Sequence, residues 1–440
     1  MEFIDGYSRY ECLLSGMAIF CSFGIKEDYP DELIHEKWIN LQKQYPYLHD
    51  YKTIVEKGDN YSDNMPLKYK PIEQRESISD YLNDLMDFVS SETIKQEKLS
   101  KNNSLLSYAR IQIKDIKYTI FSLSTSHCRT DFKAITFIAT SFLNSFENIT
   151  TIYPSEGMYP VLVEKKLIPD IKEREEIIQK YFNYKQPLKF DFTKLNENIV
   201  LTEEEKKIIS NELKDSDKPI FFISRIVKFT KEEMKKLLSF CKKNELSIQA
   251  LLDSAYLKAS LELFQNNLKD ADVVNFQIIY DQRKTLAKKS EKCIGLFVEN
   301  TFPYFPINYI NKSTIEIGKQ LTERLKKTNS IDSEDFKRFR IEYYYTHEEL
   351  FFIDYTLAAS NIGKFKCMED LSENLKEKFV DFYFLAGSRS PLPCKIGYTS
   401  IHMYSLFDGS CNIVLHFPYS VVPSIYIKKL LNRIKELMLN

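Results

Sequence analysis

Segments with helical spacing of apolar residues alternate with short strand-like runs along most of this 440-residue chain. In residues 132–146 the apolar side chains recur at helical intervals, whereas residues 273–280 form an apolar, β-branched run. Such alternation is typical of mixed α/β folds. One hydrophobic core rarely organises so long a chain, and apolar residues make up 43% of the sequence, so we expect two domains.

The expected organisation is two α/β lobes joined by a charged segment. We place an N-terminal lobe at residues 1–165, a charged helical bridge at 166–217 and a C-terminal lobe at 218–440. The bridge is rich in lysine and glutamate, and the capping box Thr202-x-x-Glu205 begins a helix within it. Because both halves share an α/β character, the predicted fold class is α/β with mixed sheets.

Individual elements follow from periodicity and capping signals. The capping boxes Thr230-x-x-Glu233 and Ser313-x-x-Glu316 begin two further helices. The other predicted helices cover residues 33–44, 77–88, 132–146, 247–264 and 425–438. The predicted strands cover residues 111–113, 118–124, 221–229 and 273–280.

Charge and glycine content exclude several classes of function. The chain has 61 basic and 62 acidic residues, a balance that gives no reason to expect nucleic acid or an anionic membrane as a partner. It has 11 glycines and neither a GxGxxG nor a GxxxxGK[ST] motif. We therefore set aside dinucleotide-binding and P-loop enzymes.

Cysteine spacing and the N-terminal sequence indicate a reduced, cytoplasmic protein. The eight cysteines are scattered without a CxxC pair, so we expect no metal site of the usual zinc spacing. The first apolar run, residues 13–25, follows Glu2, Asp5 and Glu11 rather than a basic segment, which argues against a secretory signal. It is also too short to span a bilayer, so no membrane span is expected.

The strongest local signal for chemistry is the segment 126–132, Ser-His-Cys-Arg-Thr-Asp-Phe. It lies between a predicted strand that ends near Ser124 and the predicted helix that starts at Phe132. A histidine at such a junction is held at the end of a sheet by a rigid frame. The partial positive charge of the adjacent helix N-terminus disfavours imidazolium, so His127 would stay neutral and able to act as a base.

Ordinary structural roles also account for these residues. A lone histidine at the end of a strand is more often structural or simply exposed than catalytic. Asp131 directly precedes the predicted helix, where an aspartate commonly serves as the N-cap. The local pattern alone therefore leaves both interpretations open.

The segment 126–132 resembles the HHxxxDG motif of the chloramphenicol-acetyltransferase-like superfamily, which includes condensation domains and alcohol acetyltransferases. The second motif histidine falls on His127 and the aspartate on Asp131. Other segments resemble the same superfamily in the same order, and the opening of the chain is closest to the alcohol acetyltransferase branch. These segments are Tyr7-Ser-Arg-Tyr-Glu11, Trp38 with Tyr45-Pro46-Tyr47-Leu48, residues 246–256, Tyr280-Asp281-Gln282-Arg283, residues 294–300 and Ser360-Asn361-Ile362-Gly363.

The resemblance implies two lobes with a tunnel at their interface and a CoA-dependent acyltransferase activity. His127 would be the general base that activates an alcohol or amine acceptor for attack on a thioester. Acyl-CoA, or a phosphopantetheine thioester, would be a co-substrate, with no tightly bound cofactor and a monomeric protein. Asp131 and Arg283 would support the site as an ion pair. The residues expected to line the tunnel are Ser126, Phe132, Ser360 and Asn361.

Two positions depart from the motif. Ser126 stands where relatives have the first histidine, and Phe132 stands where they have glycine. Phenylalanine would narrow the space beside the aspartate, which suggests either an altered donor channel or a site without turnover. The alternatives are therefore a stand-alone condensation enzyme that forms an amide from a carrier-bound acyl group, or a non-catalytic relative that binds an acyl chain or a protein.

Overall fold

The computed structural model describes residues 17–45, 48, 65–95, 104–127, 130–155, 190–214, 222–264, 273–281, 283, 292–295, 298–301, 304–331, 357–364, 369–388, 399–418 and 421–440. The motif-like segment at 7–11 lies outside the described residues, as do residues 156–189, which include the first part of the predicted bridge.

The first sheet has five strands in the order β10-β1-β4-β3-β2. Its pairings are antiparallel except between β2 and β3, which are parallel. A polar turn at Lys114 and Asp115, between the strands predicted at 111–113 and 118–124, joins β3 to β4 as a hairpin. The strands are β1 (Met17–Ile25), β2 (Leu67–Lys68), β3 (Leu105–Ile113), β4 (Ile116–Ser126) and β10 (Phe379–Ser388).

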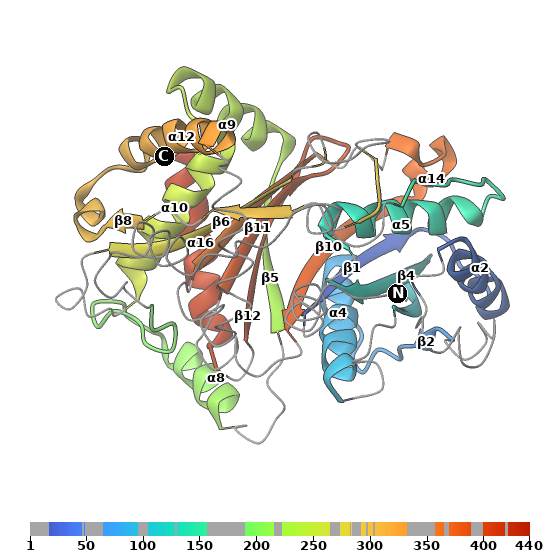
Figure 1. Ribbon diagram of the computed structural model, residues 1–440. Helices are drawn as coiled ribbons and strands as arrows, with labels where there is room; N and C mark the ends of the chain where they lie inside the picture. Colours follow the sequence, from blue (N-terminus) through green and yellow to red (C-terminus); the bar gives the residue numbers. More distant parts are fainter. Residues whose placement is uncertain are drawn as a thin grey trace, which may run out of the picture.

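Helices cover both faces of this sheet (Figure 1). Alternate residues of β1 pack into two clusters, because successive side chains of a strand point to opposite faces. Phe23 packs with Trp38 and Phe142 on one face, and Phe20 packs with Leu85 on the other. The helices are α2 (Asp31–Gln44) and α5 (Phe132–Ser145) on the first face, and α4 (Ile78–Lys95) on the second.

The second sheet has the order β5-β12-β11-β9-β6-β7, with β8 paired to β6. Strand β9 is parallel to both of its neighbours, β11 and β6, and the other pairings are antiparallel. Both sheets are therefore mixed. The strands are β5 (Phe222–Phe229), β6 (Val273–Asp281), β7 (Val298–Thr301), β8 (Tyr304–Pro306), β9 (Leu357–Lys364), β11 (Thr399–Ser405) and β12 (Cys411–Pro418).

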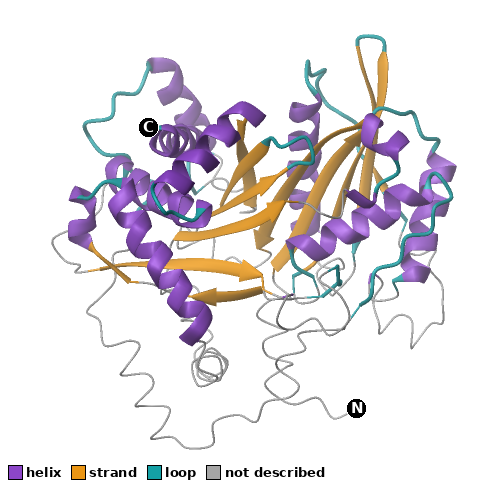
Figure 2. Cartoon of the chain, turned by 90° about the horizontal axis from the view of Figure 1, so that it is seen from above, coloured by secondary structure: helices purple, strands orange, loops and turns teal. Residues whose placement is uncertain are grey.

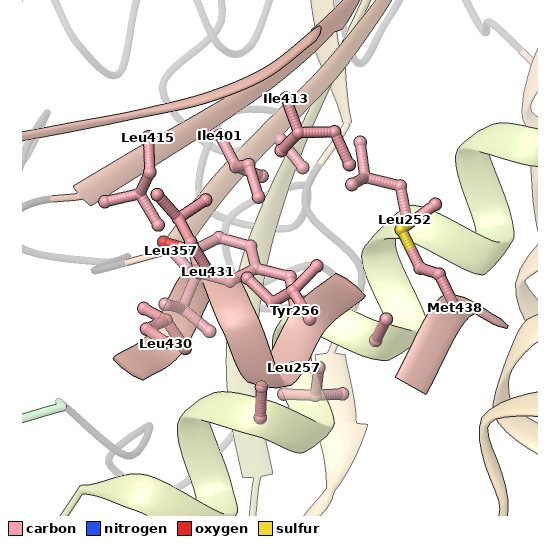
Figure 3. Close-up of a cluster of buried hydrophobic side chains, with 14 of the residues drawn as sticks. Leu252, Tyr256, Leu257, Leu357, Ile401, Ile413, Leu415, Leu430, Leu431 and Met438 are labelled. Atoms are coloured by element: carbon pink, nitrogen blue, oxygen red, sulfur yellow. The ribbon is translucent and has the colours of Figure 1, made fainter. Parts of the chain in front are cut away.

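The second sheet and its helices pack together through an apolar core. Figure 3 shows Leu252 and Tyr256 of α10 and Leu430 of α16 facing Ile401 and Leu415 of the sheet. Figure 2 shows helices on either side of the strands when the molecule is seen from above. The remaining helices are α8 (Glu203–Leu213), α9 (Lys231–Lys243), α10 (Ile248–Leu263), the 3-10 helix η5 (Ile307–Asn311), α12 (Thr314–Ile331), α14 (Glu373–Lys378) and α16 (Ser424–Leu439).

The predicted helices and strands are present, with differences at their ends. The capping boxes at Thr202 and Thr230 form with both of their reciprocal hydrogen bonds. The helix predicted at 77–88 continues to Lys95. A tertiary contact supports this extension, since the Ser90 hydroxyl donates to the Phe222 carbonyl oxygen at 2.8 Å.

Strand β10 comes from the second half of the chain but belongs to the first sheet. Its residues pair along the whole of β1, from Met17 opposite Ser388 to Ile25 opposite Phe379. In Figure 1 the orange β10 lies beside the blue β1. This pairing covers a sheet edge that would otherwise be open to other strands. The second half of the chain therefore contributes a strand to the first sheet, and the lobe boundaries at 165 and 218 stay predictions.

Candidate active site

His127 directly follows the last residue of β4 and lies five residues before the first residue of α5. Strand β4 is held between β1 and β3, so its end has a fixed position. The side-chain hydroxyls of Thr125 and Thr130 contact each other across the intervening loop. This frame places His127 where the sequence predicts it, between the end of a strand and the start of a helix.

The ring of His127 has a defined orientation. Its Nδ1 atom lies 2.9 Å from the Thr130 carbonyl oxygen. A carbonyl oxygen can only accept, so Nδ1 donates and Nε2 is the basic nitrogen of the neutral ring. Burial lowers the pKa of His127, opposed by the Thr130 carbonyl and the Asp131 carboxylate. The ring is therefore suited to accept a proton through Nε2 at neutral pH.

One carboxylate oxygen of Asp131 accepts from two different parts of the chain. Its Oδ1 atom accepts from the backbone N–H of Ala134 at 2.9 Å, which makes Asp131 the N-cap of α5. The same oxygen accepts from Nη2 of Arg283 at 2.7 Å. Both side chains are almost fully buried, at 1% and 2% exposure. The same carboxylate therefore caps α5 and forms the ion pair with Arg283.

Arg283 connects the end of β6 and the segment at Cys293 to the start of α5. Its Nε donates to the Cys293 carbonyl oxygen at 3.0 Å, and its Nη1 donates to Asp281 Oδ1 at 2.9 Å. Asp281 also accepts from Lys133 of α5 at 2.6 Å. Although burial opposes it, the charges of Arg283 and Lys133 lower the pKa of Asp281. The sequence motif contained Asp281, whereas Lys133 was not singled out because a lysine in a first helical turn carries no distinctive signal.

Phe132 lies between the two lobes rather than open to solvent. Its side chain is 8% exposed, and its ring packs edge-on against Phe384 of β10 with centroids 5.0 Å apart. On the other side it contacts His402 of β11 at 4.6 Å and stacks toward His416 of β12 at 6.4 Å. The residue that replaces the motif glycine therefore fills space at the lobe junction close to His127.

The structure adds His402 and His416, which the sequence did not reveal as site residues. Their ring centroids are 4.8 Å apart, and both residues are buried. His127 is close enough that its charge, after the larger effect of burial, lowers the pKa of His402 to about 3. The sequence signal was weak, because each of these histidines shares its strand with other polar residues and no motif marks it.

The other residues expected to line a tunnel have different positions. Ser126 ends β4 and pairs with Ala18. Ser360 of β9 pairs with His402, and its hydroxyl donates to the Ile279 carbonyl oxygen at 3.2 Å. Asn361 Oδ1 accepts from the backbone N–H of Gly363, whose φ is +82°. The structure thus brings Ser360 toward the histidine pair, while Asn361 supports the local backbone.

The described residues contain neither a cluster of metal ligands nor a membrane-spanning helix. None of their His, Cys, Asp and Glu side chains gather in a group of three or more that could hold a metal ion. Within the same part of the chain, every helix is too short or too polar to cross a membrane.

Comparison with known proteins identifies the fold through structure rather than sequence. No protein-family model matches the chain, and no curated protein sequence matches it. Solved structures do match over nearly its whole length. The trichothecene 15-O-acetyltransferase TRI3 from Fusarium sporotrichioides has a TM-score of 0.61 at 10% identity, covering 98% of this chain and 93% of that one.

Two condensation-type structures match similarly. The EpoB NRPS cyclization-docking bidomain from Sorangium cellulosum has a TM-score of 0.59 at 11% identity. The match covers 98% of this chain and 84% of the bidomain. The condensation domain from Monacolin K polyketide synthase MokA has a TM-score of 0.57 at 10% identity, with 99% and 95% covered. The chain therefore has the two-lobed, mixed α/β fold of condensation domains and chloramphenicol-acetyltransferase-like proteins, which confirms the predicted fold class.

Proposed function

We propose that the protein is an acyltransferase that moves an acyl group from a thioester to an alcohol or amine, with His127 as the general base. The observation that carries this proposal is the arrangement of His127, whose Nδ1 is directed at the Thr130 carbonyl so that Nε2 is the free base. The Asp131–Arg283 pair supports the helix start beside it. The fold shared with an acetyltransferase and with condensation domains supports the same reaction class.

In the proposed reaction, Nε2 of His127 accepts the proton of the acceptor hydroxyl or amine as its oxygen or nitrogen attacks the thioester carbonyl carbon. The new C–O or C–N bond forms and the C–S bond breaks. The leaving thiolate then receives the proton from the imidazolium. The product is an ester or amide plus a free thiol, and no covalent acyl-enzyme is needed.

We propose acyl-CoA as the donor and a short acyl group such as acetyl. The match to a trichothecene acetyltransferase over nearly the full length of both chains supports this choice. Phe132, which fills space against His402 at the junction of the lobes, also favours a short acyl group. The alternative is a carrier-bound acyl thioester, since condensation domains have the same fold.

The test is to incubate the purified protein with a panel of acyl-CoAs and a mixture of alcohols and amines. Mass spectrometry would detect the acylated acceptor, and a thiol reagent would measure free CoA. The proposal expects both products to appear together and to disappear in His127→Ala. Release of CoA without an acylated acceptor would indicate hydrolysis instead.

A second candidate is a non-catalytic relative that binds an acyl chain. The packing of Phe132 against Phe384 and His402 favours it, because the side chain occupies space that glycine would leave open. In that case acyl-CoA would raise the melting temperature of the protein without turnover. The Phe132→Gly variant would also show no activity with any donor.

A further inference from the structure

A polar patch lies on the face of the second sheet that meets the first lobe. Ser224 of β5 is directly opposite His416 of β12, and His402 of β11 is directly opposite Val414 of β12. Residues opposite one another, or two positions apart on a strand, share one face of a sheet. Ser224, His402 and His416 therefore share a face, and the contact of both histidines with Phe132 identifies it as the face toward α5.

These three side chains are buried with unpaired polar atoms. Their exposures are 1% for Ser224, 3% for His402 and 0% for His416. Among the described residues, the Ser224 hydroxyl, Nδ1 of His402 and both ring nitrogens of His416 lack a hydrogen-bond partner. Buried polar groups in native proteins are nearly always paired, so several unpaired groups side by side point to a ligand that completes them.

The patch is uncharged. The residues opposite the two histidines on the same face are Ser224, Ser400, Val414 and Ser360. Burial lowers the pKa of His402 to about 3 and that of His416 well below its usual value, so both rings are neutral at neutral pH. A neutral imidazole offers one N–H donor and one nitrogen acceptor. A hydroxyl group, which both donates and accepts, matches such a surface better than a carboxylate or an ammonium group.

We propose that Ser224, His402 and His416 form a subsite that binds additional hydroxyl groups of the acceptor, so that the acceptor is a polyhydroxylated alcohol. The inference rests on the proposed acyl transfer and specifies its substrate class. The reactive hydroxyl would lie at His127, while another hydroxyl of the same molecule would bind the patch across the ring of Phe132.

The kinetic test uses acceptors that match in carbon number but differ in hydroxyl count. With acetyl-CoA as donor, kcat/KM would be measured for glycerol against propanol and for sorbitol against hexanol. One well-made hydrogen bond corresponds to a roughly tenfold change in binding. The kcat/KM of the wild-type protein should therefore be at least about tenfold higher for a polyol than for the matching mono-alcohol. His416→Leu and Ser224→Ala should each reduce this preference, mainly through a higher KM for the polyol.

Ser254→Ala is the matched control, because Ser254 is an equally buried serine of α10 whose hydroxyl already donates to the Leu251 carbonyl oxygen. It should retain the preference for polyols. Should His416→Leu fail to fold, Ser224→Ala carries the test. Equal rates for polyols and mono-alcohols in the wild type would overturn the proposal, and so would an unchanged preference in Ser224→Ala.

A binding measurement separates this inference from the proposed function. With ¹⁵N-labelled histidine, the ring signals of His402 and His416 should shift when sorbitol is added. His35 of α2, which packs against Tyr108, serves as the internal reference whose signal should stay fixed. Shifts without any acyl transfer would support the subsite while contradicting the proposed function. Signals that do not move would contradict the subsite even if acyl transfer is observed.

Discussion

Asp131 and Arg283 meet through a single carboxylate oxygen. Oδ1 of Asp131 accepts from Arg283 Nη2 at 2.7 Å and from the Ala134 backbone N–H at 2.9 Å. The start of α5 is therefore attached to the segment that follows β6. Although burial opposes it, the Asp131 charge raises the pKa of Arg283, so this guanidinium remains charged in the interior.

Removing Asp131 should be strongly destabilising. In Asp131→Ala a buried guanidinium loses a partner, and loss of one partner of a buried pair typically costs about 3 kcal/mol or more. Asp281 still contacts Arg283, so the lower end of that range is expected. Asp131→Asn keeps an acceptor for the N-cap hydrogen bond but removes the charge. Its loss of unfolding free energy relative to the wild type therefore measures the contribution of the ion pair alone. Chemical denaturation measures both variants.

A double-mutant cycle tests whether the two side chains interact. Asp131→Ala and Arg283→Ala, alone and combined, should give a coupling free energy of about 1 kcal/mol or more, because residues in one hydrogen-bonded network are not additive. Purely additive losses would mean that the ion pair does not contribute, and Asp131 would then act only as the cap of α5.

His402 should make the protein less stable in mild acid. Its pKa is lowered from 6.5 to about 3 by burial and by the charge of His127. The unfolded chain therefore binds more protons between these values, and stability present above pH 6.5 is lost as the pH falls toward 3. From pH 7 to pH 5 this residue alone would account for about 2 kcal/mol.

The measurement is urea unfolding of the wild type and of His402→Leu across this pH range. The stability of the variant should fall less steeply with decreasing pH. Parallel curves for the two proteins would show that His402 takes up its proton at the same pH in the folded and unfolded chains.

Phe132 should influence both stability and donor choice. Phe132→Gly removes contacts with Phe384 and His402, and truncation of a buried phenylalanine typically costs about 3–5 kcal/mol. It should also open space beside His127 and allow longer acyl groups. Melting temperature and the profile of rate against acyl length are measured on the same variant.

Phe142→Ala is the matched control for this change. Phe142 is a buried residue of α5 that packs on Phe121 and Phe146, about 15 Å along the helix from Phe132. It should lower the melting temperature without changing the acyl-length profile. If Phe132→Gly gives a stable, active protein with an unchanged profile, Phe132 does not narrow the donor site.

Local features of the fold could be predicted from the sequence because their signals are local. The capping boxes at Thr202 and Thr230, the helix after Asp131 and the hairpin turn at Lys114 depend on residues a few positions apart. The pairing of β10 with β1 joins residues more than 350 positions apart, and no periodicity indicates which strand will cover a given edge.

The candidate site likewise contains residues that the sequence predicted and residues that it did not. His127, Asp131 and Phe132 are near neighbours in the sequence, and the family resemblance supplied Arg283. His402 and His416 were missed because a single histidine in a buried strand is usually structural. Only the strand register, which places both beside Phe132, makes them candidates for binding.

The rate of acyl transfer should depend on a base that titrates below the ordinary histidine range. Because burial lowers the pKa of His127, kcat/KM should stay level as the pH falls through 6.5 and decline only below it. An acid limb centred above 6.5 would indicate a different titrating group or a more exposed ring. The profile is measured by release of free CoA at an acceptor concentration well below KM.

The most direct test of the proposed mechanism is the turnover of His127→Ala compared with His35→Ala, in which a histidine of α2 outside the site is replaced. Both variants should show the circular dichroism spectrum of the wild type. Loss of a general base predicts that kcat for acylated acceptor falls by at least ~10²-fold in His127→Ala, while His35→Ala retains the wild-type rate. Wild-type turnover by a well-folded His127→Ala protein would contradict the account.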